Sequence, residues 1–320
     1  MNEQKDTVSI IVPCYNEEAT IRAFYEEVVL VMKQCRSDYE LLFVDDGSKD
    51  RTLQTAIELS ENDERVSYLS LSRNFGKESA MYAGLCNANG DYVVIIDADL
   101  QHPPSMILDM YDVLKHDESY DGVAAKRVTR DGDPWLRTWF SRRFYKLFNR
   151  FSDIDVQDGS GDFRMMRRGM VEAVIAMDEY NRFSKGILSW IGFNTCWLSF
   201  ENKDRVAGES KWSFWKLLRY AIDGITSFSQ APLYAASWLG IGLTVLSVMA
   251  IAFIVIRKLM FGDPVAGWAS TICVIIFIGG IQLCVLGIIG QYLAKTYMET
   301  KGRPHYVVSR SNRDNVIRIK

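Results

Sequence analysis

Short apolar runs alternate with stretches of helical spacing over the first part of the chain, up to about residue 127. Five apolar runs predict strands, which are Val8–Tyr15, Tyr39–Val44, Val66–Leu71, Tyr92–Ile96 and Gly122–Lys126. Apolar residues at helical spacing predict helices between them, at about Glu17–Gln34, Asp50–Ser60, Lys77–Cys86 and Pro104–Lys115. Near-continuous apolar strands separated by helices are typical of a mostly parallel sheet with helices on both faces. The pattern therefore predicts an α/β fold.

Two long runs near the end of the chain, Ala231–Ile256 and Val265–Ala294, contain no charged residue. Each exceeds the roughly 20 residues that a helix needs to cross a bilayer. A buried core helix is the alternative for each run, but two such runs joined by a short polar hairpin favour a membrane-spanning pair. We expect a first domain over residues 1–230, a two-helix transmembrane hairpin over 231–295 and a basic tail over 296–320.

Two stretches of the first domain combine an apolar stripe with interleaved arginine and lysine. One is Trp135–Phe151, and the other, Trp212–Phe228, leads directly into the first long run. This combination is typical of an amphipathic helix that lies in the membrane interface. For Trp135–Phe151, a helix that packs its stripe on its own domain explains the pattern equally well.

Charge and composition limit which binding partners and which cellular location we expect for the protein. The net charge of −3, without a basic tract, argues against nucleic acid as the principal partner. Lysine and arginine flank the two runs more densely than they occupy the hairpin, which predicts that both termini and the first domain are cytoplasmic in a multi-pass protein of the inner membrane. The polar N-terminus offers no apolar signal region. The six cysteines form no C-x-x-C pair and suit a reducing compartment.

Acidic residues follow the fourth predicted strand. Asp97 and Asp99 are one residue apart, and Gln101 adds a neutral oxygen two positions later. Ligands of parallel sheets bind beyond the carboxyl ends of the strands, and Mg²⁺ or Mn²⁺ takes oxygen ligands that it shares with substrate phosphates. The pattern predicts a metal–diphosphate site, against the alternative of a solvated acidic turn.

Other polar segments leave two interpretations open. Asp45-Asp46-Gly47-Ser48 after the second strand suits either a turn and helix cap or contacts to a nucleoside. Arg73–Lys77 suits either an anionic ligand or a plain surface loop. Arg205–Trp212, with Arg205, Ser210 and Lys211, suits a phosphate clamp or an ordinary basic flank of the membrane. Asp162 lies in a glycine-rich segment for which a turn is the default.

These segments together are similar to family 2 glycosyltransferases of the GT-A fold, a Rossmann-like fold. The residues that carry the resemblance are, in chain order, VSIIVPCYNEE, FVDDGSKDRT, GDYVVIIDADLQHPP, GSGDFR and RVAGESKW. More narrowly they resemble polyprenyl-phosphate glycosyltransferases, the group that includes dolichol-phosphate mannose synthases. AIDGITSFS before the long runs and KGRPHY after them look most like the bactoprenol glucosyltransferases of O-antigen modification.

The resemblance implies a role for each matching residue. The nucleotide sugar would be bound by Pro13, Tyr15, Glu17, Asp45, Asp46, Lys77, Asp97, Ala98 and Asp99. The metal would be bound by Asp97, Asp99 and Gln101, and the lipid phosphate or diphosphate by Arg127, Arg137, Arg205, Ser210 and Lys211. Asp162 matches the aspartate that serves as catalytic base or positions the sugar, and Asp99 is the other expected catalytic residue.

The resemblance further implies a metal-dependent, inverting transfer of glucose from UDP-glucose to undecaprenyl phosphate at the cytoplasmic membrane face. Sister enzymes that use GDP-mannose or a UDP-aminoarabinose donor are the alternative within the family. A membrane scaffold that only binds nucleotide sugar is the alternative outside it. A processive polysaccharide synthase is disfavoured because the Q-x-x-R-W motif is absent. Small residues in the second run permit a homo-oligomer through the helices; they are Gly279, Gly280, Gly287 and Gly290.

Overall fold

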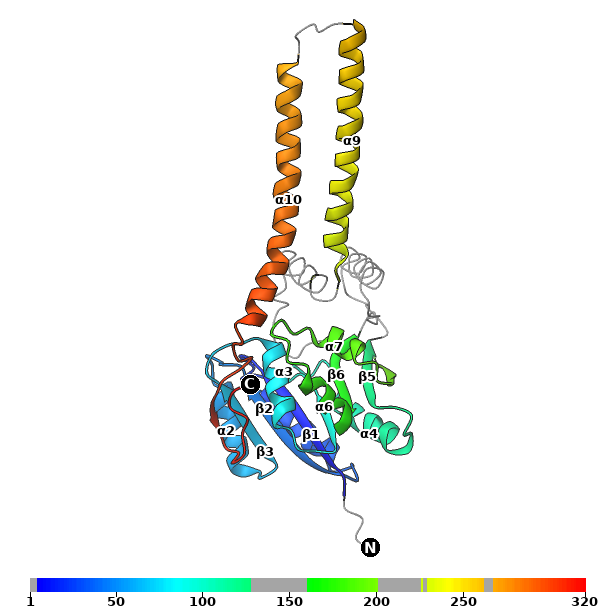
Figure 1. The fold of residues 1–320 in the computed structure, drawn as a ribbon. Coiled ribbons are helices and arrows are strands. Elements are labelled where there is room, and N and C mark those ends of the chain that lie inside the picture. Colours follow the sequence, from blue (N-terminus) through cyan, green and yellow to red (C-terminus); the bar gives the residue numbers. More distant parts are fainter. Residues whose placement is uncertain (1–4, 128–159, 201–225, 227–228, 262–266) are drawn as a thin grey trace.

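The structure, a computed structural model, describes residues 5–127, 160–200, 226, 229–261 and 267–320. The described strands form one sheet in the order β7-β5-β6-β4-β1-β2-β3-β8 (Figure 1). The strands are β1 Thr7–Cys14, β2 Asp38–Asp45, β3 Val66–Leu71, β4 Tyr92–Ile95, β5 Gly122–Arg127, β6 Ser160–Arg167, β7 Thr195–Phe200 and β8 Val308–Ser311. The helices are α1 Ile21–Met32, α2 Thr52–Asn62, α3 Lys77–Asn87, α4 Met106–His116, α6 Arg168–Ala176, α7 Ser184–Trp190, α9 Ala231–Phe261 and α10 Trp268–Thr300.

The sheet is mostly parallel. Strands β4, β1, β2 and β3 pair in parallel, as do β5 and β7, whereas β6 and β8 run antiparallel to their neighbours. The five predicted strands are β1 to β5, and the four predicted helices are α1 to α4, with ends that shift by a few residues. The expected α/β fold class is therefore confirmed.

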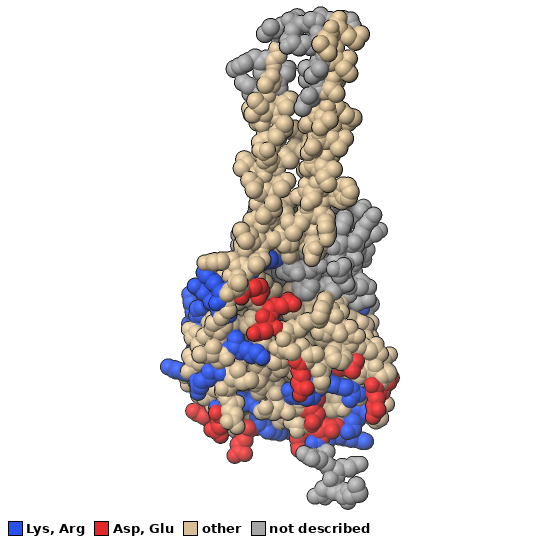
Figure 2. All heavy atoms as spheres, in the orientation of Figure 1, with Lys and Arg blue, Asp and Glu red and all other residues tan. Residues whose placement is uncertain are grey.

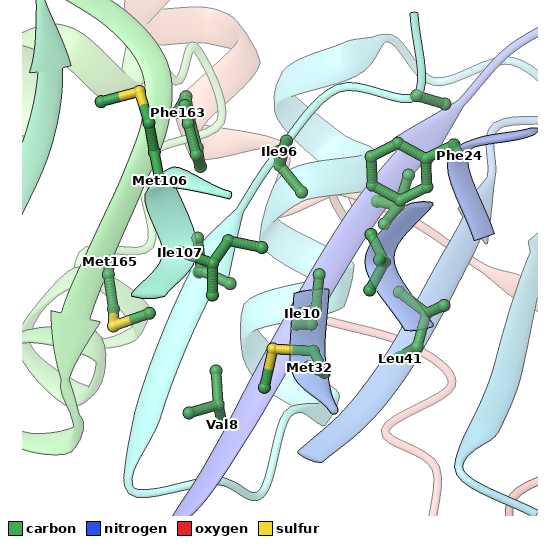
Figure 3. Packing of buried hydrophobic residues seen from close by; sticks show 14 of the residues in the cluster. Val8, Ile10, Phe24, Met32, Leu41, Ile96, Met106, Ile107, Phe163 and Met165 are labelled. Atoms are coloured by element: carbon green, nitrogen blue, oxygen red, sulfur yellow. The ribbon is translucent and has the colours of Figure 1, made fainter. Parts of the chain in front are cut away.

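Alternating side chains of the central strands form two cores, one on each face of the sheet. Ile10 and Phe43 point to the face that α1, α2 and α4 cover, in a core that includes Phe24 (Figure 3). Ile11 and Leu42 point to the opposite face, which α3, α6 and α7 cover. These four strand side chains are fully buried. Because both faces are covered, the strands read as continuous apolar runs rather than alternating ones.

The segment after α10 returns to the sheet. Strand β8 pairs with β3, and Ser309 Oγ donates a hydrogen bond to the Ser70 carbonyl at 3.0 Å. Tyr306 is fully buried in the core beneath α3. The interpretation of residues 296–320 as a basic tail missed this strand, because the pairing joins residues far apart in sequence. Residues 305–311 are therefore part of the same sheet domain that carries the candidate site residues described below.

Helices α9 and α10 rise side by side from one end of the sheet domain (Figure 1). Their most apolar stretches, Ala231–Ala250 and Val274–Thr300, are long and apolar enough to cross a membrane. At most 6% of the most apolar window of either stretch is buried among the described residues, so neither stretch packs as a core helix of the sheet domain. Glu299 joins α10 to the domain, because its carboxylate accepts hydrogen bonds from the backbone N–H groups of Tyr180 and Asn181, at 3.1 and 3.2 Å.

The charge distribution changes sharply between the two parts of the molecule. Blue and red side chains are spread over the sheet domain, whereas the visible face of the two long helices is almost wholly uncharged (Figure 2). The amphipathic helices expected at Trp135–Phe151 and Trp212–Phe228 lie outside the described residues, apart from Thr226.

Candidate active site

The loops after β1 and β2 are tied to each other by hydrogen bonds. The Asn16 N–H donates to Ser48 Oγ at 3.0 Å, and the Lys49 N–H donates back to Asn16 Oδ1 at 2.9 Å. The Glu17 N–H donates to Thr52 Oγ1 at 2.8 Å. Asn16 has a positive φ of 56°, a conformation that asparagine tolerates better than most residues. The two strand ends therefore form one joined loop structure.

Three predicted nucleotide-binding residues belong to the first loop and differ in exposure. Pro13 is buried at the end of β1, whereas the side chain of Tyr15, at 38%, is exposed. Glu17 is half-buried, and its carboxylate accepts a hydrogen bond from Thr20 Oγ1 at 3.0 Å. Tyr15 is thus an aromatic residue that this edge of the sheet presents to solvent.

Asp45 and Asp46 at the end of β2 are buried and bonded inside the domain. Asp45 accepts hydrogen bonds from the Ser48 N–H and from Ser70 Oγ, each at 3.0 Å. Asp46 accepts them from the N–H groups of Phe75 and Gly76, at 2.7 and 2.9 Å. Burial raises the pKa of the Asp46 carboxyl, against the opposing effect of these two amides. The turn expected as one alternative is present, and a nucleoside contact of either carboxylate stays a prediction.

Gly47 allows the β2 loop to approach the segment after β3. Its φ is +68°, and a Cβ atom there would lie 2.6 Å from the Arg73 carbonyl carbon. A side chain at this position would collide with backbone, which cannot rotate away. The sequence Asp-Gly is therefore required for Asp46 to reach the amides of Phe75 and Gly76.

Lys77 contacts two carboxylates, one at the end of β4 and one near the start of β6. Its Nζ lies 2.7 Å from Asp97 Oδ1, just beyond β4, and 2.7 Å from Asp162 Oδ2 in β6. The three side chains are only partly buried, with 44%, 27% and 22% of their area exposed. Burial alone would lower the pKa of Lys77, but the two carboxylates outweigh it and raise that pKa above its usual value.

The expectation of a turn around Asp162 is wrong, because the residue lies in β6. Strand β6 pairs with both β4 and β5 in antiparallel register. The alternation of polar Asp162 and Arg164 with apolar Phe163 and Met165 is typical of a strand and could have revealed it. The strand carries Asp162 to the same edge as Asp97, where both carboxylates contact Lys77.

Sequence reasoning missed a group of residues around Asp162. Arg164 is buried, and its Nη2 donates to the Gly161 carbonyl at 3.0 Å. Burial would raise the pKa of Asp162, but the charges of Lys77, Lys185 and Arg164 hold that pKa well below its usual range. Asp162 is therefore a firmly ionised carboxylate among cations.

His102 is a second residue that the sequence reasoning missed. Its ring packs against Phe163 and Phe200, with centroid distances of 5.3 and 5.1 Å. Burial lowers the pKa of His102, against the opposing charges of Asp97 and Asp99. The histidine therefore supports the loop after β4 by packing between the two aromatic rings.

The donor atoms beyond β4 suit a divalent cation. Asp97 and Asp99 supply carboxylate oxygens, and the Gln101 N–H donates to Asp99 Oδ1 at 3.1 Å, which folds the loop back on itself. Between the two aspartates Ala98 is buried, and Leu100 has a positive φ of 58°. Hard oxygen donors are the ligands that Mg²⁺ or Mn²⁺ prefers. The described residues contain no group of three or more acidic, histidine or cysteine ligands, so metal binding by Asp97, Asp99 and Gln101 stays a prediction.

The remaining predicted residues fall mainly outside the described part of the chain. Arg127 is the last residue of β5. The other predicted phosphate-binding residues lie in ranges that the structure does not describe; they are Arg137, Arg205, Ser210 and Lys211. Their roles stay predictions.

Comparison with known proteins identifies the family. Residues 9–175, more than half of the chain, match the family described as glycosyl transferase family 2. The chain belongs to glycosyl transferase family 2. As a glycosyltransferase it is an enzyme that transfers a sugar, and the resemblance seen in its motifs is confirmed.

Relatives of this family 2 protein match over almost the full length. The chain is 41% identical over 308 residues to the putative glycosyltransferase CsbB of Bacillus subtilis (strain 168), which covers 96% of this chain and 93% of that protein. It is also 41% identical to the SfII prophage-derived bactoprenol glucosyl transferase of Shigella flexneri, over 96% of this chain and 99% of that protein.

Solved structures include more distant matches. A mannosyl-3-phosphoglycerate synthase from Rubrobacter xylanophilus is 21% identical, with a TM-score of 0.48, over 69% of this chain and 72% of that one. A glucosyl-3-phosphoglycerate synthase from Mycobacterium tuberculosis, in complex with Mn²⁺ and UDP-glucose, is 19% identical, with a TM-score of 0.46, over 69% of this chain and 77% of that one.

Proposed function

We propose that this family 2 enzyme transfers glucose from UDP-glucose to a polyprenyl phosphate at the cytoplasmic face of the membrane, with inversion at the anomeric carbon. The observation that carries the proposal is the 41% identity to a bactoprenol glucosyl transferase over 99% of that protein's length. The match extends beyond the sheet domain and includes the region of both apolar helices. A soluble acceptor would not require helices of this kind.

The edge of the sheet offers the groups that such a transfer needs. The exposed ring of Tyr15 and the half-buried Glu17 are suited to the nucleoside, while Asp45 and Asp46 fix the loops beside them. A divalent cation held by Asp97, Asp99 and Gln101 would offset charge on the departing diphosphate. Arg127, Arg137, Arg205, Ser210 and Lys211 are proposed to bind the phosphates of the acceptor or donor.

The bond changes follow from the charges of the two substrates. An oxygen of the acceptor phosphate forms a bond to the anomeric carbon, while the bond from that carbon to the diphosphate oxygen breaks and UDP departs. A phosphate monoester has a second pKa of about 6, so the attacking oxygen carries no proton to remove at neutral pH. In-line attack on an α-linked donor gives a β-linked product.

Asp162 is assigned to holding the sugar and Lys77 rather than to accepting a proton. Its pKa is well below the usual range because of the neighbouring cations, and a carboxylate of this kind is a weak base at neutral pH. Its position opposite Asp97, with Lys77 between them, allows it to orient a sugar hydroxyl beside the diphosphate.

The test is sugar transfer by the purified full chain in detergent, with undecaprenyl phosphate and either Mg²⁺ or Mn²⁺. UDP-glucose, GDP-mannose and a UDP-aminoarabinose derivative are offered in parallel, and EDTA and Asp99→Ala serve as controls. We expect lipid-linked glucose that both controls abolish. Transfer from another donor would correct the sugar, and nucleotide-sugar binding without any transfer would favour a binding scaffold.

A further inference from the structure

The first turns of α3 and α7 are joined beside Asp162. Glu78, the second residue of α3, accepts a hydrogen bond from the Ser184 N–H at 3.1 Å and another from Ser184 Oγ. Ser184 is the first residue of α7. Each partner has a lysine as its neighbour in sequence, Lys77 before Glu78 and Lys185 after Ser184. The hydrogen bonds between the helices therefore hold together the two helix starts that carry these lysines.

The two lysines have different partners. Lys77 is held between Asp97 and Asp162, at 2.7 Å from each. Lys185 is half-buried and makes no ion pair with any residue that the structure describes, although its charge acts on Asp162. Arg164, the third cation near Asp162, is buried and bonded to the Gly161 carbonyl. Among these three cations, Lys185 is thus the one that is neither buried nor held by a carboxylate of the described residues.

We propose that Lys185 binds a phosphate group at the Asp162 end of the active site, either the diphosphate of the nucleotide sugar or the phosphate of the lipid acceptor. This assignment rests on the proposed function. A lysine ammonium acts on phosphate as a compact point charge with three donors. Ser184 and Glu78 position it, because their hydrogen bonds fix the start of the short helix that carries it.

A merely structural role predicts a different result. If Lys185 only balances the charge of Asp162, its removal matters while that carboxylate is present and has no effect once the carboxylate is gone. If Lys185 contacts phosphate, its removal weakens phosphate binding in both backgrounds. The two roles can therefore be separated with Lys185→Gln made in the wild type and in Asp162→Asn.

The experiment measures binding by calorimetry on the full chain in detergent, without any sugar transfer. One titration uses Mn²⁺ with inorganic pyrophosphate, which represents the donor diphosphate. The other uses farnesyl phosphate without metal, which represents the acceptor. Lys33→Gln, an exposed change at the end of α1, is the matched control. Lys185→Met is made beside Lys185→Gln in case one of them folds poorly, and Lys185→Arg keeps the charge.

We expect Lys185→Gln to weaken at least one titration about tenfold in both backgrounds, as the loss of one charge-assisted hydrogen bond would. Lys185→Arg should retain most of the affinity. Loss with pyrophosphate assigns the donor phosphates, and loss with farnesyl phosphate assigns the acceptor. Changes below twofold in both titrations, or a loss that disappears in Asp162→Asn, would overturn the proposal. Failure of the wild type to transfer glucose would contradict the proposed function and leave these titrations unaffected.

Discussion

The two acidic ends of the sheet, at β2 and at β4, are built in different ways. Asp45 and Asp46 are almost fully buried, and every carboxylate oxygen accepts a hydrogen bond from inside the sheet domain. Asp97 and Asp162 are partly exposed and share the ammonium group of Lys77. Asp46 binds two backbone N–H groups, whereas Asp97 and Asp162 bind the side-chain ammonium of Lys77.

The difference indicates a division of work between the two ends. Bonds to backbone amides define the shape of the β2 end before any ligand arrives. The β4 end is a charge cluster of side chains, in which a metal ion would bind the carboxylates and a phosphate would bind the Lys77 ammonium, with no backbone hydrogen bond broken. Mutations at the β2 end should therefore reduce stability, and mutations at the β4 end should reduce activity.

The largest effect is expected from Asp97→Asn. The change removes a charge that serves both Lys77 and the proposed metal, and sugar transfer should fall by about 100-fold or more. The melting temperature should change little, because the side chain is partly exposed. Transfer rates and Mn²⁺ binding by electron paramagnetic resonance test this. Asp109→Asn, exposed on α4, is the control, and unchanged Mn²⁺ binding in Asp97→Asn would contradict the metal assignment.

Asp46→Asn should act mainly on stability. The amide of asparagine accepts through one oxygen, so one of the Phe75 and Gly76 N–H groups loses its partner in a buried place. We expect the free energy of unfolding to fall by about 1–3 kcal/mol. Denaturation in detergent measures it against Asp162→Asn, which should lose activity with a smaller loss of stability. The reverse order of stabilities would break the division between the two ends.

Gly47→Ala should cost about 1 kcal/mol or somewhat more, because the new Cβ meets the Arg73 backbone and the positive φ disfavours alanine. Gly169→Ala is the matched change, since Gly169 lies in α6 and nothing is within 4 Å of an added Cβ. That variant should gain about 0.5 kcal/mol. Equal melting temperatures for the two variants would show that the β2 loop tolerates movement.

The sequence predicted the half of the sheet in which local pattern and fold agree. Strands β1 to β5 were found because each is a continuous apolar run, and the acidic strand ends followed from them. Strand β8 escaped because its partner β3 lies more than two hundred residues earlier. The contact of Ser184 with Glu78, which positions Lys185, escaped because it depends on two helices that the sequence does not place together.

Strand β8 also sets the order of events during synthesis. It leaves the ribosome after α9 and α10, so β3 remains an open edge while both apolar helices are being made. An open edge is a template for pairing with other chains. Pairing of β8 with β3 is therefore the last step in forming the sheet. We expect a nascent chain that stalls before this step to keep β3 as an unpaired edge strand that is prone to aggregation. Completion of the sheet domain therefore comes only after the synthesis of both apolar helices.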